Sequence, residues 1–337
     1  MTQGDLKEHY DVIVQHQAAL GAQAVSIGTP GHCRYCGNTD PASFTSVAHT
    51  FPEALGNRWV ISVDECDGCN SKFSICDAAL TEAVGAFLTL GGVPRKRGPS
   101  RQLGKSGSQS VAVHTKESGE RRLSFRLTNS DSDSAVQLDP ASGTLRLKIP
   151  LAPVPFKPLR AYKAVAKMGF ALLPDSDLKH YETERAWLVG AEDENRIRDH
   201  LVIASFGFVG NAPPLVVGRL LRRRNPEVPL PHTVFILCVG SICLQIALKA
   251  DSLDDHVPAD AISNVNVRCT NILGTPEAPV FRVDYVNPVL WDWSSSLSTP
   301  QPMEAVILSF NQITRQGSFE PVFRSNPANV RGDESSS

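Results

Sequence analysis

The sequence predicts an α+β fold in which a small cysteine-rich module is followed by a separate α+β domain rich in antiparallel strands. Three observations support this prediction: two Cys-x-x-Cys pairs in a turn-rich stretch, an apolar helical pattern directly after them, and many short strand-like runs in the rest of the chain. Because domains commonly hold about 100–200 residues, the 337 residues correspond to about two domains.

Composition places the chain among ordinary globular proteins. Hydrophobic residues make up 42% and charged residues 20%, which excludes wholesale disorder. Lys and Arg number 33 and Asp and Glu 35, so the net charge of −2 excludes a histone-like polycation but not a local basic patch. The most apolar run, 234–248, is shorter than the roughly 18 residues of a membrane span. The amino terminus lacks the basic-then-apolar order of a signal peptide, and we therefore expect a soluble cytoplasmic protein without a membrane segment.

Apolar periodicity predicts two helices in the first part of the chain. One covers residues 4–22, and the other covers 70–90, where Phe73, Leu80 and Phe87 share one face. Gly, Pro and Ser dominate the stretch that follows the second helix, which is typical of a linker. The predicted divisions are an N-terminal helix at 1–27, the cysteine-rich module at 28–90, a basic flexible linker at 91–109, an α+β domain of unknown role at 110–323 and a disordered tail at 324–337.

The α+β domain is predicted to be rich in strands. Short strand-like runs fill 110–149, and Pro158 opens a helix over 158–172, with a further helix over 175–188. Strand-like runs then continue towards the carboxyl terminus. Two of them, 234–239 and 242–248, are separated by Gly-Ser, which predicts a β-hairpin.

The cysteine spacing predicts a structural zinc site. Four of the eight cysteines form two Cys-x-x-Cys pairs, and a reducing cytoplasm favours metal binding over disulfides for such pairs. The 29 residues from Gly37 to Glu65 exceed the roughly 15–20 of a simple zinc ribbon, so a further element is inserted between the pairs. The four remaining cysteines lie among apolar residues and are expected in the core. The predicted zinc ligands are Cys33, Cys36, Cys66 and Cys69.

The insert and the second cysteine pair resemble a known family. The segment AHTFPEALGN, residues 48–57, is followed by CDGCN, residues 66–70, and then by the helical pattern. Histidine, proline, a Leu-Gly turn and Cys-Cys-Asn in this order resemble the zinc-knuckle members of the HNH endonuclease family over about residues 30–88. The resemblance implies a ββα-metal finger, in which a β-hairpin and a helix hold a single divalent metal, and cleavage of nucleic acid, with double-stranded DNA as the expected substrate.

Site residues follow from the same resemblance. It implies that His49 is the general base, that Asn70 is a ligand of a catalytic Mg²⁺ or Mn²⁺, and that Asn57 orients the loop between the strands. An unperturbed histidine pKa near 6.5 leaves a neutral imidazole available at physiological pH, in agreement with this role. The chain departs from the family at Ala48, where an acidic metal ligand is usual, and hard cations prefer carboxylate oxygen. The acids that we consider as substitutes are Glu53, Asp64, Glu65 and Asp67.

Each of these residues also has a structural interpretation. His49 is then a structural histidine in an inactive finger, Asn70 caps the helix and Asn57 is a turn residue. Under this alternative the chain is a non-catalytic nucleic-acid-binding zinc module coupled to a partner- or ligand-binding domain, and a zinc-stabilised interaction scaffold is the third class of function.

Basic residues in the linker are the predicted nucleic-acid contacts, because this stretch has positive charge and no acid. We also expect a homodimer or a protein partner through the C-terminal domain. A second basic run at 219–224 fits either phosphate contact or an exposed strand end, and the sequence Asp254-Asp255-His256 fits a solvated acidic loop better than a metal site. The predicted linker contacts are Arg95, Lys96, Arg97, Arg101 and Lys105.

Overall fold

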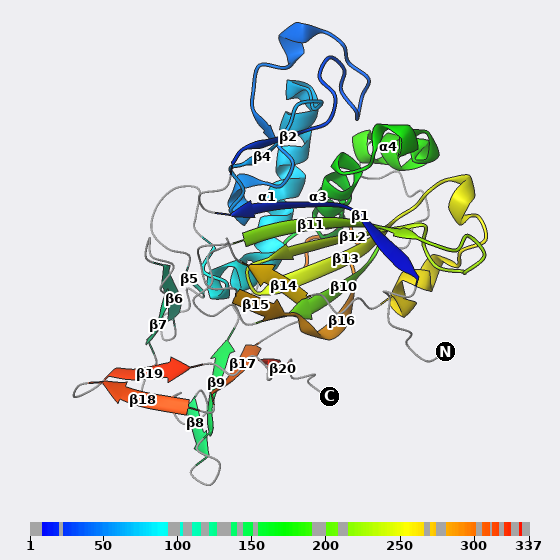
Figure 1. The fold of residues 1–337 in the computed structure, drawn as a ribbon. Coiled ribbons are helices and arrows are strands. Elements are labelled where there is room, and N and C mark those ends of the chain that lie inside the picture. Colours follow the sequence, from blue (N-terminus) through cyan, green and yellow to red (C-terminus); the bar gives the residue numbers. More distant parts are fainter. Residues whose placement is uncertain are drawn as a thin grey trace.

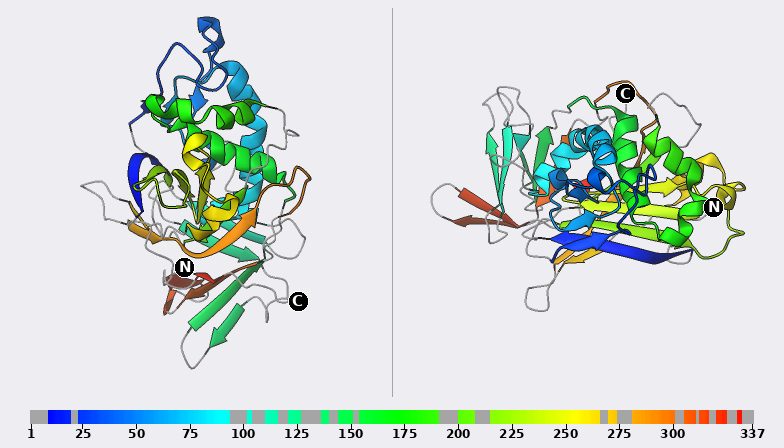
Figure 2. Two further views of the ribbon diagram at one scale, coloured as in Figure 1. Left: turned by 90° about the vertical axis from the view of Figure 1, so that its right-hand side faces the viewer. Right: turned by 90° about the horizontal axis from the view of Figure 1, so that it is seen from above.

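The structure is a computed structural model that describes residues 9–19, 23–93, 154–190, 200–207, 215–265 and 281–300, together with the backbone of short strands between 102 and 150, at 270–273 and between 305 and 331. Its centre is a six-stranded antiparallel sheet with helices packed against one face (Figure 1). Seen from above, α1 at Asp67–Leu90 and α3 at Pro158–Ala171 lie side by side over that face (Figure 2). The α+β class predicted from the sequence is confirmed.

The central sheet contains the predicted hairpin. Strands β12 and β13 pair so that Val239 lies opposite Ile242, which leaves Gly240 and Ser241 as the two-residue loop. Gly240 has a φ of 53°, the left-handed conformation that such a loop needs and that favours glycine. Every residue of β12 is buried, because apolar clusters cover both faces of the sheet. In spatial order, the strands are β1 at Tyr10–Ala19, β11 at Leu215–Arg223, β12 at Thr233–Val239, β13 at Ile242–Leu248, β10 at Leu201–Phe206 and β16 at Val286–Asp292.

The helix predicted over residues 4–22 is wrong for its described part. Residues Tyr10–Ala19 form β1, which pairs with β11 from Tyr10 opposite Arg223 to Ala19 opposite Leu215, with an irregularity between Val12 and Val14. Beyond this irregularity, burial alternates along residues 14–18, as a strand requires. The run Val-Ile-Val at 12–14 is β-branched, which favours a strand, and pairing with β11 outweighs the weak helical pattern.

The other predicted helices agree with the structure, with one interruption. Helix α1 covers the 70–90 prediction, and α3 covers the 158–172 prediction with Pro158 in its first turn. The helix predicted over 175–188 is divided into a 3-10 turn, η4 at Asp175–His180, and α4 at Glu182–Val189. Tyr181 lies at the division, where its buried hydroxyl is 2.5 Å from the Thr233 hydroxyl, so a tertiary contact interrupts the helical pattern.

The cysteine-rich module and the sheet share one hydrophobic core, unlike the separate domain expected from the linker. One buried cluster joins Phe73 and Phe87 of α1 to Met168 of α3 and Leu237 of β12. The end of α1 approaches the β12–β13 turn so closely that a Cβ on Gly91 would lie 2.3 Å from the Gly240 Cα. The apolar residues of α1 pack against α3 and the sheet, which removes the expected boundary between two cores.

The remaining strands form smaller sheets. The strands predicted within 110–149 are confirmed for the backbone, and β9 pairs with β17 from the far end of the chain. Of the predicted disordered tail, the described residues are Arg324, at the end of β19, and strand β20. The strands of the smaller sheets are β2 at Val25–Ile27, β3 at Ala48–His49, β4 at Val60–Ser62, β5 at Gln102–Leu103, β6 at Ser110–Thr115, β7 at Arg121–Arg126, β8 at Val136–Asp139, β9 at Thr144–Pro150, β14 at Thr270–Leu273, β15 at Phe281–Asp284, β17 at Ala305–Phe310, β18 at Gln312–Gln316, β19 at Glu320–Arg324 and β20 at Val330–Arg331.

Within the described residues, α1 is the single helix whose length and apolar composition suffice to cross a membrane. Of its most apolar 18-residue window, 56% is buried inside the protein. A core helix of a soluble protein passes the same test, so this is weak support for a membrane span.

Candidate active site and zinc centre

Strands β3 and β4 and helix α1 form a small strand-strand-helix unit. We call this unit, together with β2 and the loops between residues 23 and 66, the finger. Ala48 lies opposite Ser62 and His49 opposite Ile61 in an antiparallel pair, and β2 adds a parallel partner on the other edge of β4. Helix α1 begins directly after Cys66, whose backbone is extended. This is the order of elements that the resemblance implies.

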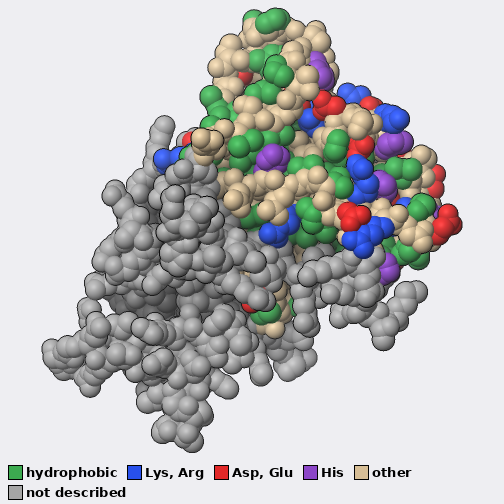
Figure 3. Space-filling model, in the orientation of Figure 1, with side chains coloured by type: hydrophobic (Ala, Val, Ile, Leu, Met, Phe, Trp, Pro, Cys, Tyr) green, Lys and Arg blue, Asp and Glu red, His purple; other side chains and the backbone are tan. Residues whose placement is uncertain are grey.

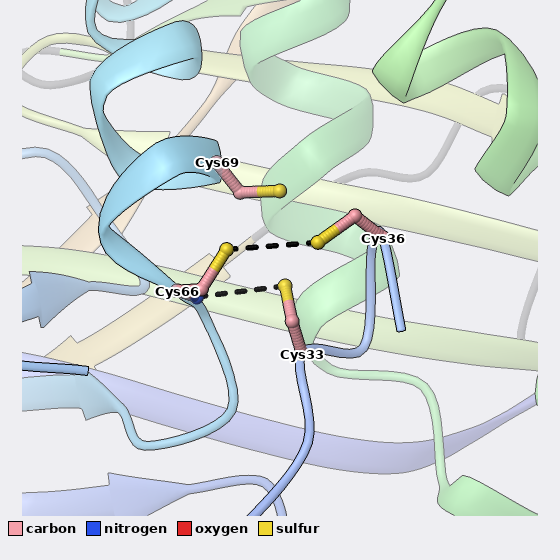
Figure 4. A group of neighbouring side chains, drawn as sticks. All are labelled: Cys33, Cys36, Cys66 and Cys69. Carbon is pink, nitrogen blue, oxygen red and sulfur yellow. Dashed lines mark hydrogen bonds between the residues drawn. The ribbon is translucent and has the colours of Figure 1, made fainter. Parts of the chain in front are cut away.

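The four predicted zinc ligands come together at the start of α1 (Figure 4). Their sulfur atoms all lie within 4.8 Å of one another, and the Cys36 and Cys66 sulfurs are 3.6 Å apart. With Zn–S bonds of about 2.3 Å, the sulfurs of a tetrahedral site lie about 3.8 Å apart, so the group fits a zinc ion. It is also the one group of three or more His, Cys, Asp or Glu side chains close enough to share a metal in the part of the chain that is described.

Contacts among the cysteines favour a thiolate at Cys33. The Cys69 thiol donates to the Cys33 sulfur, which lowers the pKa of Cys33 to about 4 and raises the pKa of Cys69. The Cys66 backbone N–H also points to the Cys33 sulfur at 3.5 Å. Because zinc binds thiolates, this group is prepared for a metal.

Asn57 holds the loop between β3 and β4. Its side-chain Nδ2 donates to the carbonyls of Phe51 and Val60 at 2.6 and 2.8 Å, and its Oδ1 accepts from the N–H groups of Trp59 and Val60 at 3.0 and 2.9 Å. The residue is fully buried, and three of the four bonds are buried with it, the bond from Trp59 being partly so. Asn57 therefore has the loop-orienting contacts that the resemblance implies, and it is more than a surface turn residue.

His49 lies on β3 with a half-buried side chain. Its carbonyl oxygen accepts a hydrogen bond from Lys167 Nζ at 3.3 Å. The next residue, Thr50, bonds to the Ser62 hydroxyl at 2.9 Å, and its N–H donates to the Val60 carbonyl. The backbone at His49 and at the residue after it is therefore held by polar contacts. Its part in a reaction stays a prediction.

Asn70 lies within the first turns of α1, and its N–H donates to the Cys66 carbonyl. The N-cap of α1 is Cys66, so the alternative in which Asn70 caps the helix is wrong. Ala48 is 2% exposed and offers no ligand atom. The residues present thus fit a catalytic metal only in part, and the role of Asn70 as a ligand stays a prediction.

Three of the four acids considered as substitutes for Ala48 have protein partners. Asp64 Oδ2 is 2.6 Å from Arg34 Nε, and Glu65 Oε2 is 2.7 Å from Lys167 Nζ; all four side chains are buried. Asp67 accepts hydrogen bonds from both the hydroxyl and the backbone N–H of Thr45 and of Ser46, which hold its carboxyl pKa well below the usual range. The fourth acid, Glu53, begins the 3-10 turn η3 at Glu53–Leu55. None of the three paired acids is available as a metal ligand without losing its partner.

A buried polar network joins the finger to α3, and sequence patterns did not predict it. Arg34, between the first two cysteines, donates to the Phe170 and Leu173 carbonyls at 3.2 and 2.8 Å and pairs with Asp175 at 2.9 Å. Tyr35 donates its hydroxyl proton to the Lys167 carbonyl at 3.2 Å. A charged residue between two zinc ligands is a faint signal for Arg34, whereas nothing in the sequence near Lys167 pointed to the finger.

The predicted nucleic-acid contacts all belong to the stretch after α1. The linker residues Arg95, Lys96, Arg97, Arg101 and Lys105 lie outside the described residues. On the face drawn in Figure 3, basic and acidic side chains of the described surface are interspersed.

The basic run at 219–224 corresponds to a strand end. Arg223 is buried and bonds to the Val228 and Leu253 carbonyls, and Arg224 pairs with Asp11 at 2.7 Å. Asp254 is buried and accepts from the His232 and Ala250 N–H groups at 2.8 Å, a structural role that agrees with neither the predicted solvated loop nor a metal site.

Comparison with known proteins agrees with the finger geometry. Residues 33–83 match the family model described as HNH endonuclease. This stretch contains both cysteine pairs, β3, β4 and most of α1. No curated protein and no solved structure matches the chain. The resemblance derived from the sequence is therefore confirmed over residues 33–83, which are similar to the HNH endonuclease family.

Proposed function

We propose that the chain is an endonuclease that hydrolyses phosphodiester bonds of double-stranded DNA, with Mg²⁺ or Mn²⁺ as its catalytic metal. The observation that supports the proposal best is the strand-strand-helix arrangement of β3, β4 and α1 within the matched HNH segment. A cytoplasmic location and a role in prokaryotic restriction or anti-phage defence belong to the same proposal.

In this proposal His49 takes the proton of the attacking water. A neutral imidazole does this at physiological pH, and the buried bonds of Asn57 and Thr50 keep the surrounding backbone in place. A divalent metal, when bound, neutralises charge on the scissile phosphate. Asn70 is the residue that would hold it, and because position 48 lacks a carboxylate we expect a weak metal site.

A second function is favoured by Ala48 itself. Since Ala48 offers no ligand and Asp64, Glu65 and Asp67 are engaged, the alternative is a nucleic-acid-binding zinc module without catalysis. In both functions the basic linker at 91–109 would contact phosphates, and the sheet region would bind a second copy or another protein.

Cleavage of supercoiled plasmid with Mg²⁺ or Mn²⁺ tests the proposal. We expect His49→Ala to lower the rate about 10²–10⁴-fold, because loss of a general base typically has this effect, while zinc content and DNA affinity stay unchanged. His256→Ala, an exposed histidine outside the finger, is the matched control and should cleave like the wild type. Equal cleavage by His49→Ala would remove the finger as the active site.

Ala48→Asp separates the two functions further. The new carboxylate should lower the metal concentration needed for cleavage if position 48 limits the metal site. RNA and single-stranded DNA are tested beside the plasmid. If neither the wild type nor Ala48→Asp cleaves any of these nucleic acids but both bind them, the binding module replaces the nuclease.

A further inference from the structure

Helix α3 lies outside the matched HNH segment and sends one charged side chain into the finger. Lys167 is 1% exposed. Its Nζ lies 3.3 Å from the His49 carbonyl oxygen and 2.7 Å from Glu65 Oε2, and 5.7 Å from the centre of the Phe73 ring. These contacts join α3 to β3, to the segment before α1 and to α1 itself.

The surroundings keep this lysine charged. Burial alone would lower the pKa of Lys167, but the carboxylates of Glu65 and Asp77 outweigh that effect and raise it. A buried charge is costly unless it is paired and hydrogen-bonded, and here a carboxylate and a carbonyl oxygen do both. The bond to the His49 carbonyl, at 3.3 Å, therefore has a charged donor.

The place of the contacts suggests what the lysine does. Strand β3 has two residues, so its own ladder provides few bonds to hold His49. Glu65 directly precedes Cys66, the N-cap residue of α1. By binding both the His49 carbonyl and Glu65, Lys167 fixes β3 relative to the start of the helix that carries Asn70. The Tyr35 hydroxyl in turn holds the Lys167 carbonyl, so the lysine backbone is tied to the zinc knuckle.

We propose that Lys167 is a positioning residue for His49, supplied to the HNH segment from outside it by α3. The inference rests on the proposed function of His49 as the base. The HNH segment of this chain would then reach its working geometry only when α3 is docked on it.

The test uses the full-length zinc-loaded protein and two substitutions on one helix. Lys167→Met removes the ammonium. Lys163→Met is the matched control, because Lys163 is also buried but its Nζ contacts the Gly190 carbonyl at 3.1 Å and lies 5.0 Å from the Trp187 ring centre. The readouts are the imidazole ¹⁵N signals of His49 by NMR, amide exchange of residues 48–50, and kcat and KM for plasmid cleavage.

We expect Lys167→Met to shift or broaden the His49 signals, to speed exchange at 48–50 about tenfold, and to lower kcat about 10- to 100-fold with KM within about twofold, since small misplacement of a catalytic group has effects of this size. Lys163→Met should leave the His49 signals and kcat as in the wild type. A folded Lys167→Met protein with wild-type His49 signals and exchange would overturn the inference, as would equal effects of both substitutions.

The test also separates a folding failure of the variant from a failure of the proposed function. If Lys167→Met does not fold, because Glu65 and Asp77 are left without a cation, the neutral variant Lys167→Met/Glu65→Gln/Asp77→Asn is measured in its place with the same criteria. If the wild type cleaves no nucleic acid, the proposed function fails, while the NMR and exchange measurements still decide whether Lys167 positions His49.

Discussion

The finger and the central sheet are held in different ways. In the finger, buried polar groups such as Arg34 and Asn57 bond to side chains or to backbone, around four cysteines that fit one zinc ion. In the sheet, β12 is buried along its whole length and β13 almost so, and both are apolar at nearly every position. The finger therefore adds specific bonds and a metal site to the apolar core that it shares with the sheet, whereas the sheet depends mainly on buried apolar area.

This difference has a consequence for how each part fails. Losing one metal or one buried hydrogen-bonding group affects several finger elements at once, because each of these groups joins more than one of them. Apolar burial in the sheet is spread over many side chains, so single losses are absorbed more gradually. Substitutions in the two regions should therefore differ in the size and the spread of their effects.

Zinc removal should have the largest effect. In Cys66→Ser, or after chelation, we expect amide exchange in residues 23–66 to rise by orders of magnitude while β12 and β13 stay protected, because structural zinc contributes about 10–16 kcal/mol of apparent binding energy to folding. Hydrogen exchange with mass spectrometry measures both regions together. Cys238→Ala is the control, because Cys238 is a buried cysteine of β12 outside the group of four, and this variant should bind zinc like the wild type. Unchanged exchange in the finger after zinc loss would contradict the contrast.

The substitution Asn57→Ala should have the next largest effect. It removes four hydrogen bonds from the loop and leaves the buried Phe51 carbonyl and the buried Val60 N–H without this partner, and we expect a loss of about 3 kcal/mol in the free energy of unfolding. Urea unfolding measures it. Asn38→Ala is the control in the same finger, since the Asn38 side chain accepts a single bond, from the Asp40 N–H, and its loss should be within about 1 kcal/mol. Similar losses for both would mean that the loop does not depend on Asn57.

Packing between the finger and the sheet is tested at Gly218 of β11, which faces the Phe51 ring. A Cβ there would lie 2.5 Å from the Phe51 ring, so Gly218→Ala should cost about 1–3 kcal/mol by overpacking. Gly85→Ala, in α1 with no atom within 4 Å of its added Cβ, should stabilise by about 0.5–1 kcal/mol. In Phe51→Leu/Gly218→Ala the loss should be smaller than the sum of the single losses. Strict additivity would show that the two residues do not press on each other.

The smallest effect concerns pH in the sheet region. Burial, with help from Arg223 and Arg222, lowers the pKa of His232 to about 4. The unfolded chain binds this proton below about 6.5 and the folded protein does not, so stability is complete above pH 6.5 and decreases as the pH falls towards 4. His232 is half-buried, so we expect about 1 kcal/mol rather than the full value of the shift. Between pH 7 and pH 4, the melting temperature of the wild type should fall more steeply with pH than that of His232→Gln. Equal slopes would exclude His232 as a cause of the pH dependence.

Local chemistry made parts of this molecule predictable. The cysteine pairs, the hairpin around Gly240 and the helix that starts after Cys66 follow from short spacings, because residues two to four positions apart are brought together by the backbone itself. The same applies to Pro158 at the start of α3. These features need no knowledge of distant partners.

Tertiary packing decided the rest. Residues 10–19 form a strand because β11 lies beside them, although their spacing also permits a helix. Tyr181 interrupts a helical pattern because its hydroxyl bonds to Thr233. Predicting such outcomes requires knowing which elements meet, and sequence periodicity does not contain that information.

For the candidate site, the spacing of the four cysteines predicted the zinc centre, and the resemblance of residues 48–57 and 66–70 to a known family indicated His49, Asn57 and Asn70. The pairing of Asp64 with Arg34 and of Glu65 with Lys167, which occupies both acids, comes from tertiary packing. The physical reason is that a buried carboxylate takes the nearest cation, and Lys167 reaches Glu65 only because α3 packs against α1, about a hundred residues away along the chain.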